Sequence, residues 1–430
     1  MKHLYSGDLF GTIKEYDISK IMNSDESYSD SIIEYTNKST KNVSFIYIDN
    51  LDFKLKYQSR SGMFIGYSDG TISFISVPFR NDLNVPKITF KLPGEVIFIH
   101  DITLRYPNEF ELGNRVIVAI TGMKKLYLIK FPQTSEYCQQ FESMIYLDDT
   151  DQPTPYSLYV IRKFELPCTN INCAAYNGAT NSIAFGGYES DIKIVNLDTM
   201  NISWSSKNLK ANALKHRVPV DVRKLAFVGE CPELLLCGTG YGEIRLYAPQ
   251  IQRRPIINYI IWEDKSPVTS LEVIKKWGIL KSNRSSNGSI FAIGNNKGSA
   301  LLLRLSNTPL ENGKKLNISM DVRNSALNKK KTVSLVRETV PFNISTEQLG
   351  NKLKKSAEQY KLEISTLGCF KGIMGGATTM CCFKLDKEEC KDNFFLAISG
   401  PGRYIYIFEV KKRRLVKKLV SSQKTTFVRL

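Results

Sequence analysis

One arrangement of apolar and polar positions recurs along the chain. A short apolar run leads into a turn of Gly, Asp, Asn or Ser, and an alternating run centred on Ile or Leu follows. Glycine accepts the positive φ of tight turns, and alternation is typical of strands, so each copy predicts a β-hairpin. The seven copies span residues 4–18, 63–75, 116–131, 183–197, 234–247, 290–305 and 395–410.

The spacing of the copies leaves room for more strands. If Ile13, Ile72, Leu126, Ile192, Ile244, Ala300 and Ile405 are equivalent, the successive spacings are 59, 54, 66, 52, 56 and 105 residues. A compact WD40 blade takes about 40–45 residues, so we expect long outer connections. Residues 42–48, 170–176 and 221–228 supply strands before three of the hairpins. Four-stranded units repeated seven times predict an all-β, seven-bladed WD40-like β-propeller, with residues 1–430 as a single domain.

The two ends of the sequence predict how the ring closes. Residues 1–37 supply a hairpin and an outer strand, 30–35, but no inner strand before them. The last ten residues, 421–430, form a strand with no hairpin after it. We therefore expect the C-terminal strand to complete the first blade, which hides two sheet edges that would otherwise invite aggregation.

Two insertions interrupt the pattern. Residues 132–155 are acidic and turn-rich, which predicts an exposed loop of the third blade. Residues 306–370, between the sixth and seventh hairpins, are basic and contain a capping box and apolar positions near helical spacing. They predict a short amphipathic helix, docked on its own propeller rather than on a partner. The residues concerned are Ser345 and Gln348 for the cap, Leu349, Leu353, Tyr360 and Ile364 for the apolar stripe, and Lys352, Lys354 and Lys355 for the exposed side.

Composition narrows the class of protein. Apolar residues make up 42% of the chain, enough for a large core, yet none of the apolar runs approaches the ~18 residues of a membrane span. The first residues lack a signal-peptide core, so we expect a soluble intracellular protein. The nine cysteines form no CxxC pair and only three histidines occur, which argues against a disulfide framework and a zinc site. We expect no metal and no cofactor.

Charge is distributed unevenly along the chain. Residues 1–200 contain 19 Lys+Arg and 24 Asp+Glu, whereas residues 201–430 contain 40 and 18. This split predicts a positive field on one side of the molecule and polyanionic partners, nucleic acid first among them. A generally basic, soluble protein remains an equal alternative on composition alone.

Candidate catalytic motifs are weak. The glycine-rich stretch 372–379 lacks the Gly-Lys-Ser/Thr of a phosphate loop, and a strand follows 237–243 where a dinucleotide turn requires a helix. No serine or cysteine lies in a nucleophile motif such as GxSxG, and the three scattered histidines offer no evident general base. We therefore predict a protein without enzymatic activity, although propeller enzymes assemble sites from distant loops.

Three basic segments are candidates for contact with a partner. Residues 411–418 fit a polyanion contact or nuclear-import signal, and they also fit an outer edge strand whose Lys and Arg discourage pairing, a role compatible with the first. Residues 215–224 and 252–255 combine arginine with rigid proline. Arg217, Arg253 and Arg254 are donors suited to phosphate or carboxylate, and solvated loop charge is as good an explanation.

Five short motifs recur among these segments and elsewhere in the second half: Arg217-Val218-Pro219-Val220, Arg245-Leu246-Tyr247, Arg253-Arg254-Pro255, Lys371-Gly372 with Gly375 and Gly376, and Arg403-Tyr404-Ile405. In combination they resemble a known family, the nucleolar WD-repeat ribosome biogenesis factors of early large-subunit precursors. The sequence departs from the family pattern at Asp221-Val222, where Trp-Asp is usual, and at Gly402, where an acidic residue is usual.

The resemblance implies a non-catalytic assembly factor in the nucleolus of the nucleus. It would act as a monomer within the pre-60S particle, away from membranes, among other assembly factors and precursor rRNA, and an AAA-ATPase would release it. The implied partner-binding residues are Arg217, Pro219, Arg245, Arg253, Arg254, Pro255, Lys371 and Arg403. Two other functions stay open: a propeller adaptor that reads peptides in a chromatin or ubiquitin-ligase complex, and an enzyme that uses a propeller funnel.

Overall fold

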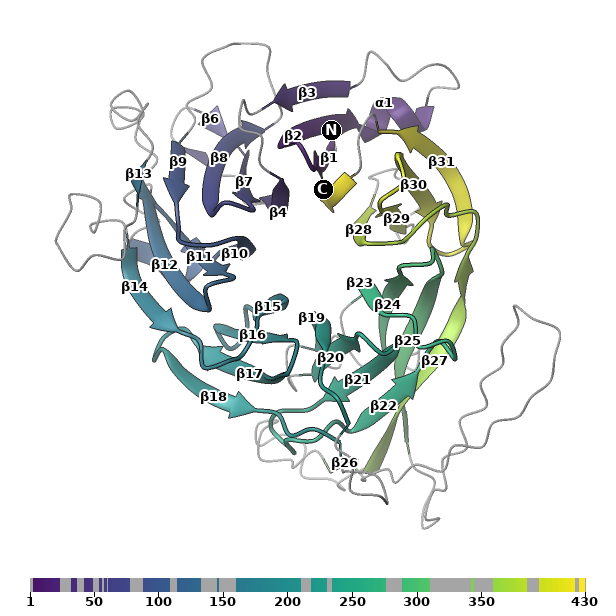
Figure 1. The fold of residues 1–430 in the computed structure, drawn as a ribbon. Helices are drawn as coiled ribbons and strands as arrows, with labels where there is room; N and C mark the ends of the chain where they lie inside the picture. The colour runs from purple at the N-terminus through teal and green to yellow at the C-terminus, as the bar shows by residue number, and fades with distance from the viewer. Residues whose placement is uncertain are drawn as a thin grey trace.

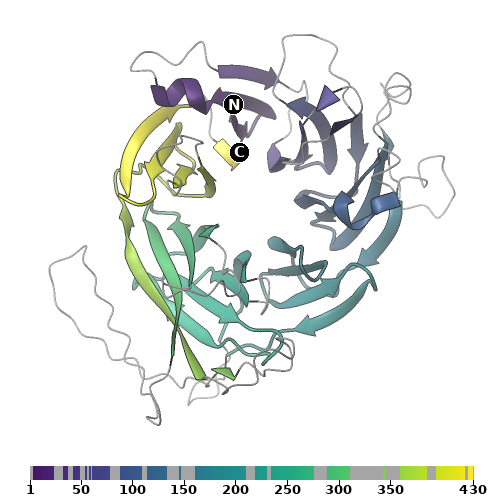
Figure 2. The same ribbon diagram turned by 180° about the vertical axis from the view of Figure 1, so that it is seen from behind.

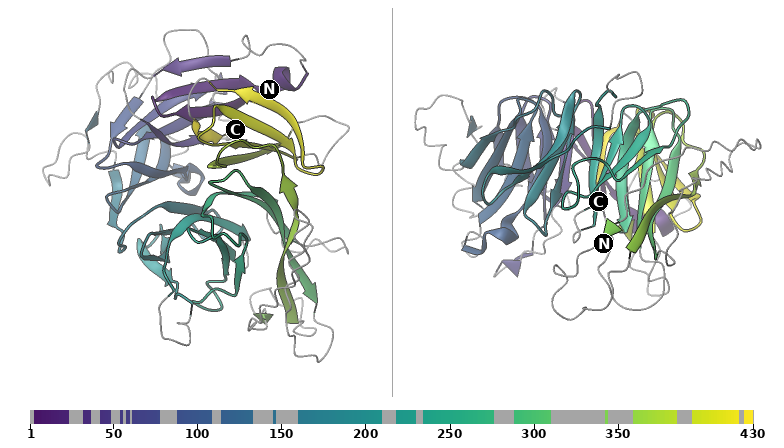
Figure 3. Two further views of the ribbon diagram at one scale, coloured as in Figure 1. Left: turned by 45° about the vertical axis from the view of Figure 1, so that its right-hand side comes forward. Right: turned by 90° about the horizontal axis from the view of Figure 1, so that it is seen from below.

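The computed structural model shows strands arranged as a closed ring (Figure 1). It describes residues 3–23, 32–36, 42–48, 54–55, 58–59, 61–77, 88–108, 114–132, 145–146, 160–209, 218–229, 234–275, 288–309, 342–343, 359–384, 394–421 and 425–429. Seen from the side, the ring is a disc whose thickness is about the length of one strand (Figure 3). The prediction of an all-β propeller is confirmed.

The strands pair into seven sheets of four or five strands, which follow one another round the ring in chain order. The first three sheets, with their strands in order of pairing, are β3 (Ile32–Thr36), β2 (Thr12–Asp17), β1 (His3–Asp8) and β32 (Thr425–Arg429); β13 (Ile145–Tyr146), β9 (Ile88–Lys91), β8 (Thr71–Val77), β7 (Ser61–Tyr67) and β4 (Val43–Ile48); and β10 (Val96–Asp101), β11 (Asn114–Thr121), β12 (Lys125–Pro132) and β14 (Val160–Glu165).

The remaining four sheets complete the circle. They are β15 (Cys173–Asn177), β16 (Ser182–Gly187), β17 (Ser190–Asn196) and β18 (Asn201–Ser205); β19 (Val222–Gly229), β20 (Leu234–Thr239), β21 (Glu243–Tyr247) and β22 (Ile257–Ile260); β23 (Val268–Lys275), β24 (Gly288–Asn295), β25 (Ala300–Pro309), β27 (Gln359–Phe370) and β26 (Phe342–Asn343); and β28 (Thr379–Lys384), β29 (Phe394–Ser399), β30 (Tyr404–Glu409) and β31 (Arg414–Val420). A separate two-stranded sheet joins β5 (Lys54–Leu55) and β6 (Gln58–Ser59), and short helices are α1 (Ile18–Asn23) and η2 (Thr103–Arg105).

Each of the seven predicted hairpins is an antiparallel pair at the middle of a sheet. The pairs are β1–β2, β7–β8, β11–β12, β16–β17, β20–β21, β24–β25 and β29–β30. Of the glycine-rich stretches, residues 240–242 form the turn between β20 and β21, so a strand does follow 237–243, and residues 371–378 lead into β28.

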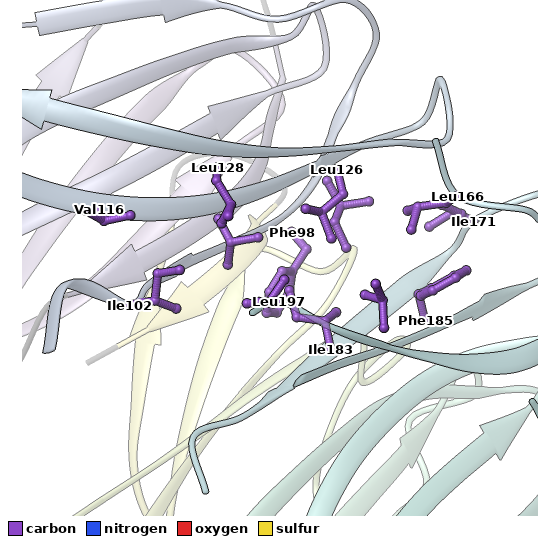
Figure 4. Packing of buried hydrophobic residues seen from close by; sticks show 13 residues of the cluster. Phe98, Ile102, Val116, Leu126, Leu128, Leu166, Ile171, Ile183, Phe185 and Leu197 are labelled. Carbon is purple, nitrogen blue, oxygen red and sulfur yellow. The ribbon is translucent and has the colours of Figure 1, made fainter. Parts of the chain in front are cut away.

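The core explains why so many of these strands are apolar on both faces. Buried side chains form seven clusters, and each cluster lies between two neighbouring sheets. Neighbouring residues of one strand serve different clusters: Ile183 and Phe185 of β16 pack toward the third sheet (Figure 4), whereas Ala184 packs toward the fifth. A shift of one residue in register would therefore exchange the two interfaces of a sheet.

The two ends of the chain meet in the first sheet. β32 pairs antiparallel with β1, opposing Tyr5 with Arg429 and Asp8 with Thr425, and the termini lie side by side from front and back (Figures 1 and 2). The cluster between the seventh and first sheets, which includes Leu4, Tyr16 and Ile407, closes the same junction through packing. The predicted closure by the C-terminal strand is confirmed.

The predicted helix of the 306–370 insertion is wrong in its C-terminal part. Residues 359–370 form β27, which pairs along β25 from Ala300↔Phe370 to Pro309↔Tyr360. Tyr360 and Ile364 are therefore strand residues, and Ile364 is buried in the cluster between the fifth and sixth sheets. Residues from Ser345 to Lys355 lie outside the described part. The β-branched and aromatic residues of 359–370 suit the outer position of a sheet, and this tertiary pairing outweighs a local helical spacing.

The predicted loop of residues 132–155 contributes a short strand. β13 pairs in parallel with β9 at the outer edge of the second sheet, so this segment reaches back from the third sheet to the second. The rest of 133–159 lies outside the described residues.

Among the helices that the structure describes, none is long and apolar enough to cross a membrane.

Removal of residues 425–430 should unfold or aggregate the protein. The deletion exposes the hydrogen-bonding edge of β1 and takes away the strand that lies between β28 and β4. Size-exclusion chromatography and thermal unfolding would show aggregates or loss of the cooperative transition, whereas deletion of Leu430 alone, beyond β32, should leave both unchanged. A truncated protein that is monomeric and melts cooperatively would contradict the closure.

Candidate partner-binding surface

The predicted partner-binding residues fall into two groups in the ring. Pro219, Arg245, Arg253, Arg254 and Pro255 surround the junction between the fourth and fifth sheets, and Lys371 and Arg403 lie between the sixth and seventh. Arg217 lies outside the described residues. The structure thus brings together residues that the sequence spreads over more than thirty positions.

The first group is organised by residues 205–209, which continue from β18 toward the fifth sheet; we call this segment the rim segment. Asn208 is its central residue. Its Oδ1 accepts a hydrogen bond from Arg245 Nη1 at 3.3 Å, and its Nδ2 donates to the carbonyl oxygen of Val218 at 2.5 Å. The carboxamide therefore joins the rim segment to β21 and to the chain that enters β19. The sequence motifs did not include Asn208, because its role depends on residues distant along the chain.

Arg253 and Arg254 bind the same segment from the turn between β21 and β22. Arg253 Nε donates to the Ser205 carbonyl oxygen at 2.6 Å, and Arg254 Nε donates to the Asn208 carbonyl oxygen at 3.3 Å. The Lys207 amide donates to the Arg253 carbonyl oxygen at 2.8 Å. All three basic side chains are exposed. The two arginines therefore anchor a backbone segment through Nε and still present positive charge to solvent.

Arg245 is placed differently from its two neighbours. Only 3% of the residue is exposed, and its Nε and Nη2 donate to Glu243 Oε2 at 3.1 and 2.9 Å. A guanidinium neutralised by a carboxylate and held by Asn208 contributes to the junction rather than to a charged surface. Pro219 is exposed and Pro255 is half-buried, so the prolines border the same junction.

Lys371 and Arg403 lie on two segments that touch. Residues 371–378 connect β27 to β28 and pass against the turn between β29 and β30. A Cβ on Gly400 would lie 1.6 Å from the Gly376 carbonyl oxygen, so only glycine permits this approach. Both basic side chains are exposed. Gly376 therefore serves close backbone packing, whereas Gly372 and Gly375 adopt positive φ angles of 89° and 82°.

Asp221, which stands where the family usually has tryptophan, has a structural role. It is buried, its Oδ2 lies 2.9 Å from Arg223 Nε, and its carbonyl oxygen accepts the Gly240 amide at 2.9 Å. A Cβ on Gly240 would lie 1.9 Å from Asp221 Oδ2. The aspartate therefore fastens the start of β19 to the turn between β20 and β21.

Charge is distributed unevenly round the ring. Described residues up to 200 include 12 Lys+Arg and 11 Asp+Glu, whereas those from 201 onward include 21 and 7. Because the sheets follow chain order, these two groups occupy opposite arcs, apart from β32 (Figure 1). The imbalance along the sequence thus becomes an imbalance across the disc, with the excess of positive charge on one arc.

Two described titratable groups, Asp101 and Cys237, are buried within the packed ring. Burial raises the pKa of the Asp101 carboxyl, which accepts bonds from the Thr103 amide and hydroxyl and lies 3.5 Å from the buried Arg115 guanidinium. Burial also raises the pKa of the Cys237 thiol to about 12, which suppresses its thiolate at neutral pH. Within the described residues, no group of three or more His, Cys, Asp or Glu could hold a metal ion.

Comparison with known proteins gives a partial similarity. The chain is 30% identical over 87 residues to the Ribosome biogenesis protein NSA1 of Meyerozyma guilliermondii. The match covers 18% of this chain and 22% of the relative. No protein-family model matches the chain. The similarity thus reaches about a fifth of each protein, and the function of the relative enters below as a proposal.

Substitution Asn208→Ala should destabilise the fold by about 1–3 kcal/mol, because the Val218 carbonyl oxygen and Nη1 of the buried Arg245 lose their bonds to Asn208, although Arg245 keeps its bonds to Glu243. Urea denaturation measures the free energy of unfolding. Asn201→Ala, an exposed position at the start of β18, is the matched control and should stay within about 0.5 kcal/mol of the wild type. Equal stability of the two variants would show that the Asn208 bonds do not secure the junction.

Proposed function

We propose that this protein is a non-catalytic assembly factor in biogenesis of the large (60S) ribosomal subunit. It would act in the nucleolus as a propeller scaffold that binds other assembly factors and precursor rRNA on pre-60S particles. The observation that carries the proposal is the similarity to a ribosome biogenesis protein in a chain that folds as a propeller. The family motifs between residues 217 and 255, most of which meet at one junction, support it.

The physical properties of the ring suit a scaffold. Seven packed interfaces hold the sheets rigidly, so the connections and turns at the rim are presented in fixed positions at little entropic cost on binding. The basic arc favours association with a ribosomal precursor, which is a polyanion. The proposal includes release from the particle by an AAA-ATPase, which the family resemblance implies.

Affinity purification of the tagged full-length chain tests this proposal. It should enrich large-subunit precursor rRNA and assembly factors, and the protein should sediment with pre-60S particles in a sucrose gradient. Enrichment of histones or ubiquitin-ligase subunits, without ribosomal precursors, would overturn the proposal in favour of a peptide-reading adaptor.

Reversal of charge by Arg253→Glu with Arg254→Glu should weaken association with the particle, and the difference from the wild type should be largest at low salt and shrink as the salt concentration rises. Both arginines also anchor the rim segment, so the paired control is Arg253→Lys with Arg254→Lys, which keeps charge but alters the Nε bonds to Ser205 and Asn208. We expect the variant with glutamate at both positions to lose association with the particle and the variant with lysine at both positions to keep it. Gradient sedimentation at two salt concentrations measures this.

If both variants associate like the wild type, the arginines do not contact the particle. If both dissociate equally and melt at a lower temperature, the arginines act only through the rim segment.

A further inference from the structure

The outer strand of the seventh sheet and the turn before it carry a dense row of basic side chains. β31 is the last strand in the order β28–β29–β30–β31, at the outer rim of the disc (Figure 1). The row, here called the basic strip, comprises Lys411, Lys412, Arg413, Arg414, Lys417 and Lys418. Lys417 is half-buried, and the other five are exposed.

Few acidic groups balance this strip. The described residues 379–384 and 394–421 contain eight Lys+Arg and a single acidic residue, Glu409, whose Oε1 lies 3.3 Å from Lys412 Nζ. Other outer strands differ: β14 carries Arg162 and Lys163 together with Glu165, and β22 has no charged residue. The concentration of positive charge is thus specific to this rim position and not a general feature of outer strands.

Contacts within the ring hold both ends of the strip in place. At the turn, Arg413 packs over β27 of the sixth sheet, so closely that a Cβ on Gly368 would lie 2.5 Å from Arg413 Nε. Near the other end, Lys418 Nζ lies 3.7 Å from the centroid of the Tyr404 ring. Next to Tyr404 is Arg403, whose carbonyl oxygen accepts the Ser421 amide at 2.8 Å. Fixed positions reduce the entropy lost when a ligand binds.

We propose that the basic strip binds the phosphate backbone of an RNA strand. A strand of seven residues at about 3.3 Å per residue extends over ~23 Å, and a nucleic-acid strand carries a phosphate about every 3.4 Å of helix axis. Three of the six cationic side chains lie on this strand, and the other three lie on the turn before it, so the strip offers six cations along a length comparable with that of a short RNA segment. Arg413 and Arg414 supply forked donors, and the lysines supply point charges.

An acidic peptide fits this surface less well. A peptide that adds to a sheet edge forms backbone hydrogen bonds with it, and closely spaced Lys and Arg on an edge strand discourage such pairing. The strip also extends beyond the N-terminal end of β31 into the turn at Lys411 to Arg413, where a peptide paired with the strand would form no further backbone hydrogen bonds. A flexible polyanion can follow both the turn and the strand.

The inference rests on the proposed function only for the identity of the RNA as precursor rRNA. Binding itself is a property of the purified protein. RNA binding can therefore be tested apart from particle association. RNA binding through the strip without enrichment of pre-60S particles would refute the proposed function alone. Enrichment of pre-60S particles without RNA binding through the strip would refute the proposal for the strip alone.

The test is fluorescence anisotropy with a labelled single-stranded oligouridine RNA, between about 50 and 200 mM salt. The strip variant is Lys411→Ser, Lys412→Ser and Arg414→Ser, which leaves the packed Arg413 and Lys418 in place. The control removes equal charge from the opposite arc, by Arg105→Ser, Lys163→Ser and Lys124→Asn. Asparagine is chosen at Lys124 because it tolerates the φ of 61° found there.

Loss of three phosphate contacts should reduce the slope of log K against log salt by about 2, at roughly 0.7 per contact, and weaken binding about tenfold. The control should change the slope by less than half of this, and both variants should melt like the wild type. Equal losses in the two variants would overturn the proposal, because only net charge would then matter.

Two other results would also overturn it. The strip variant could bind RNA like the wild type and self-associate, which would show that the basic residues only protect an edge. It could also keep RNA affinity and lose affinity for polyglutamate, which would assign the strip to an acidic protein.

Discussion

Pairing between β1 and β32 is the interaction on which the rest of the structure depends. A propeller sheet cannot bury either face alone, because each face is covered by a neighbouring sheet. The seventh interface forms only when the last strand of the chain reaches the first sheet, and the Leu4 and Tyr16 cluster then packs against residues of β28–β31. Local hairpins are thus made stable by a contact between residues more than 400 positions apart, and loop closure on that scale carries a large entropic cost.

At the junction between the fourth and fifth sheets, basic residues both hold the structure together and expose positive charge. Arg253 and Arg254 use Nε to hold backbone carbonyls of the rim segment, while Arg245 is buried against Glu243. The basic residues of these motifs therefore maintain a junction between sheets, and Lys207 and the two arginines also leave positive charge exposed there. Substitutions here affect stability and binding together, and charge-conserving variants are needed to separate the two effects.

The electrostatic asymmetry follows from the order of the sheets. In a fold whose strands cross between distant layers, the nearly neutral first part and the strongly basic second part of the described residues would intermix. Here consecutive sheets are neighbours, so the sequence imbalance is carried over into space, and the seventh sheet concentrates it on one outer strand. A rigid disc with one basic arc can orient a polyanion before specific contacts form.

The sequence by itself determined the seven hairpins, the propeller and its closure, because alternation and turn glycines are local signals of strand and turn. For residues 411–418 it left both a partner contact and an outer edge strand open. Tertiary structure alone decided that Tyr360 and Ile364 belong to a strand, since pairing along β25 outweighs a local helical spacing. It also decided that Asn208 organises the candidate surface and that Arg245 lies buried. Those roles depend on partners brought together by the ring, and no local pattern of residues encodes such distances.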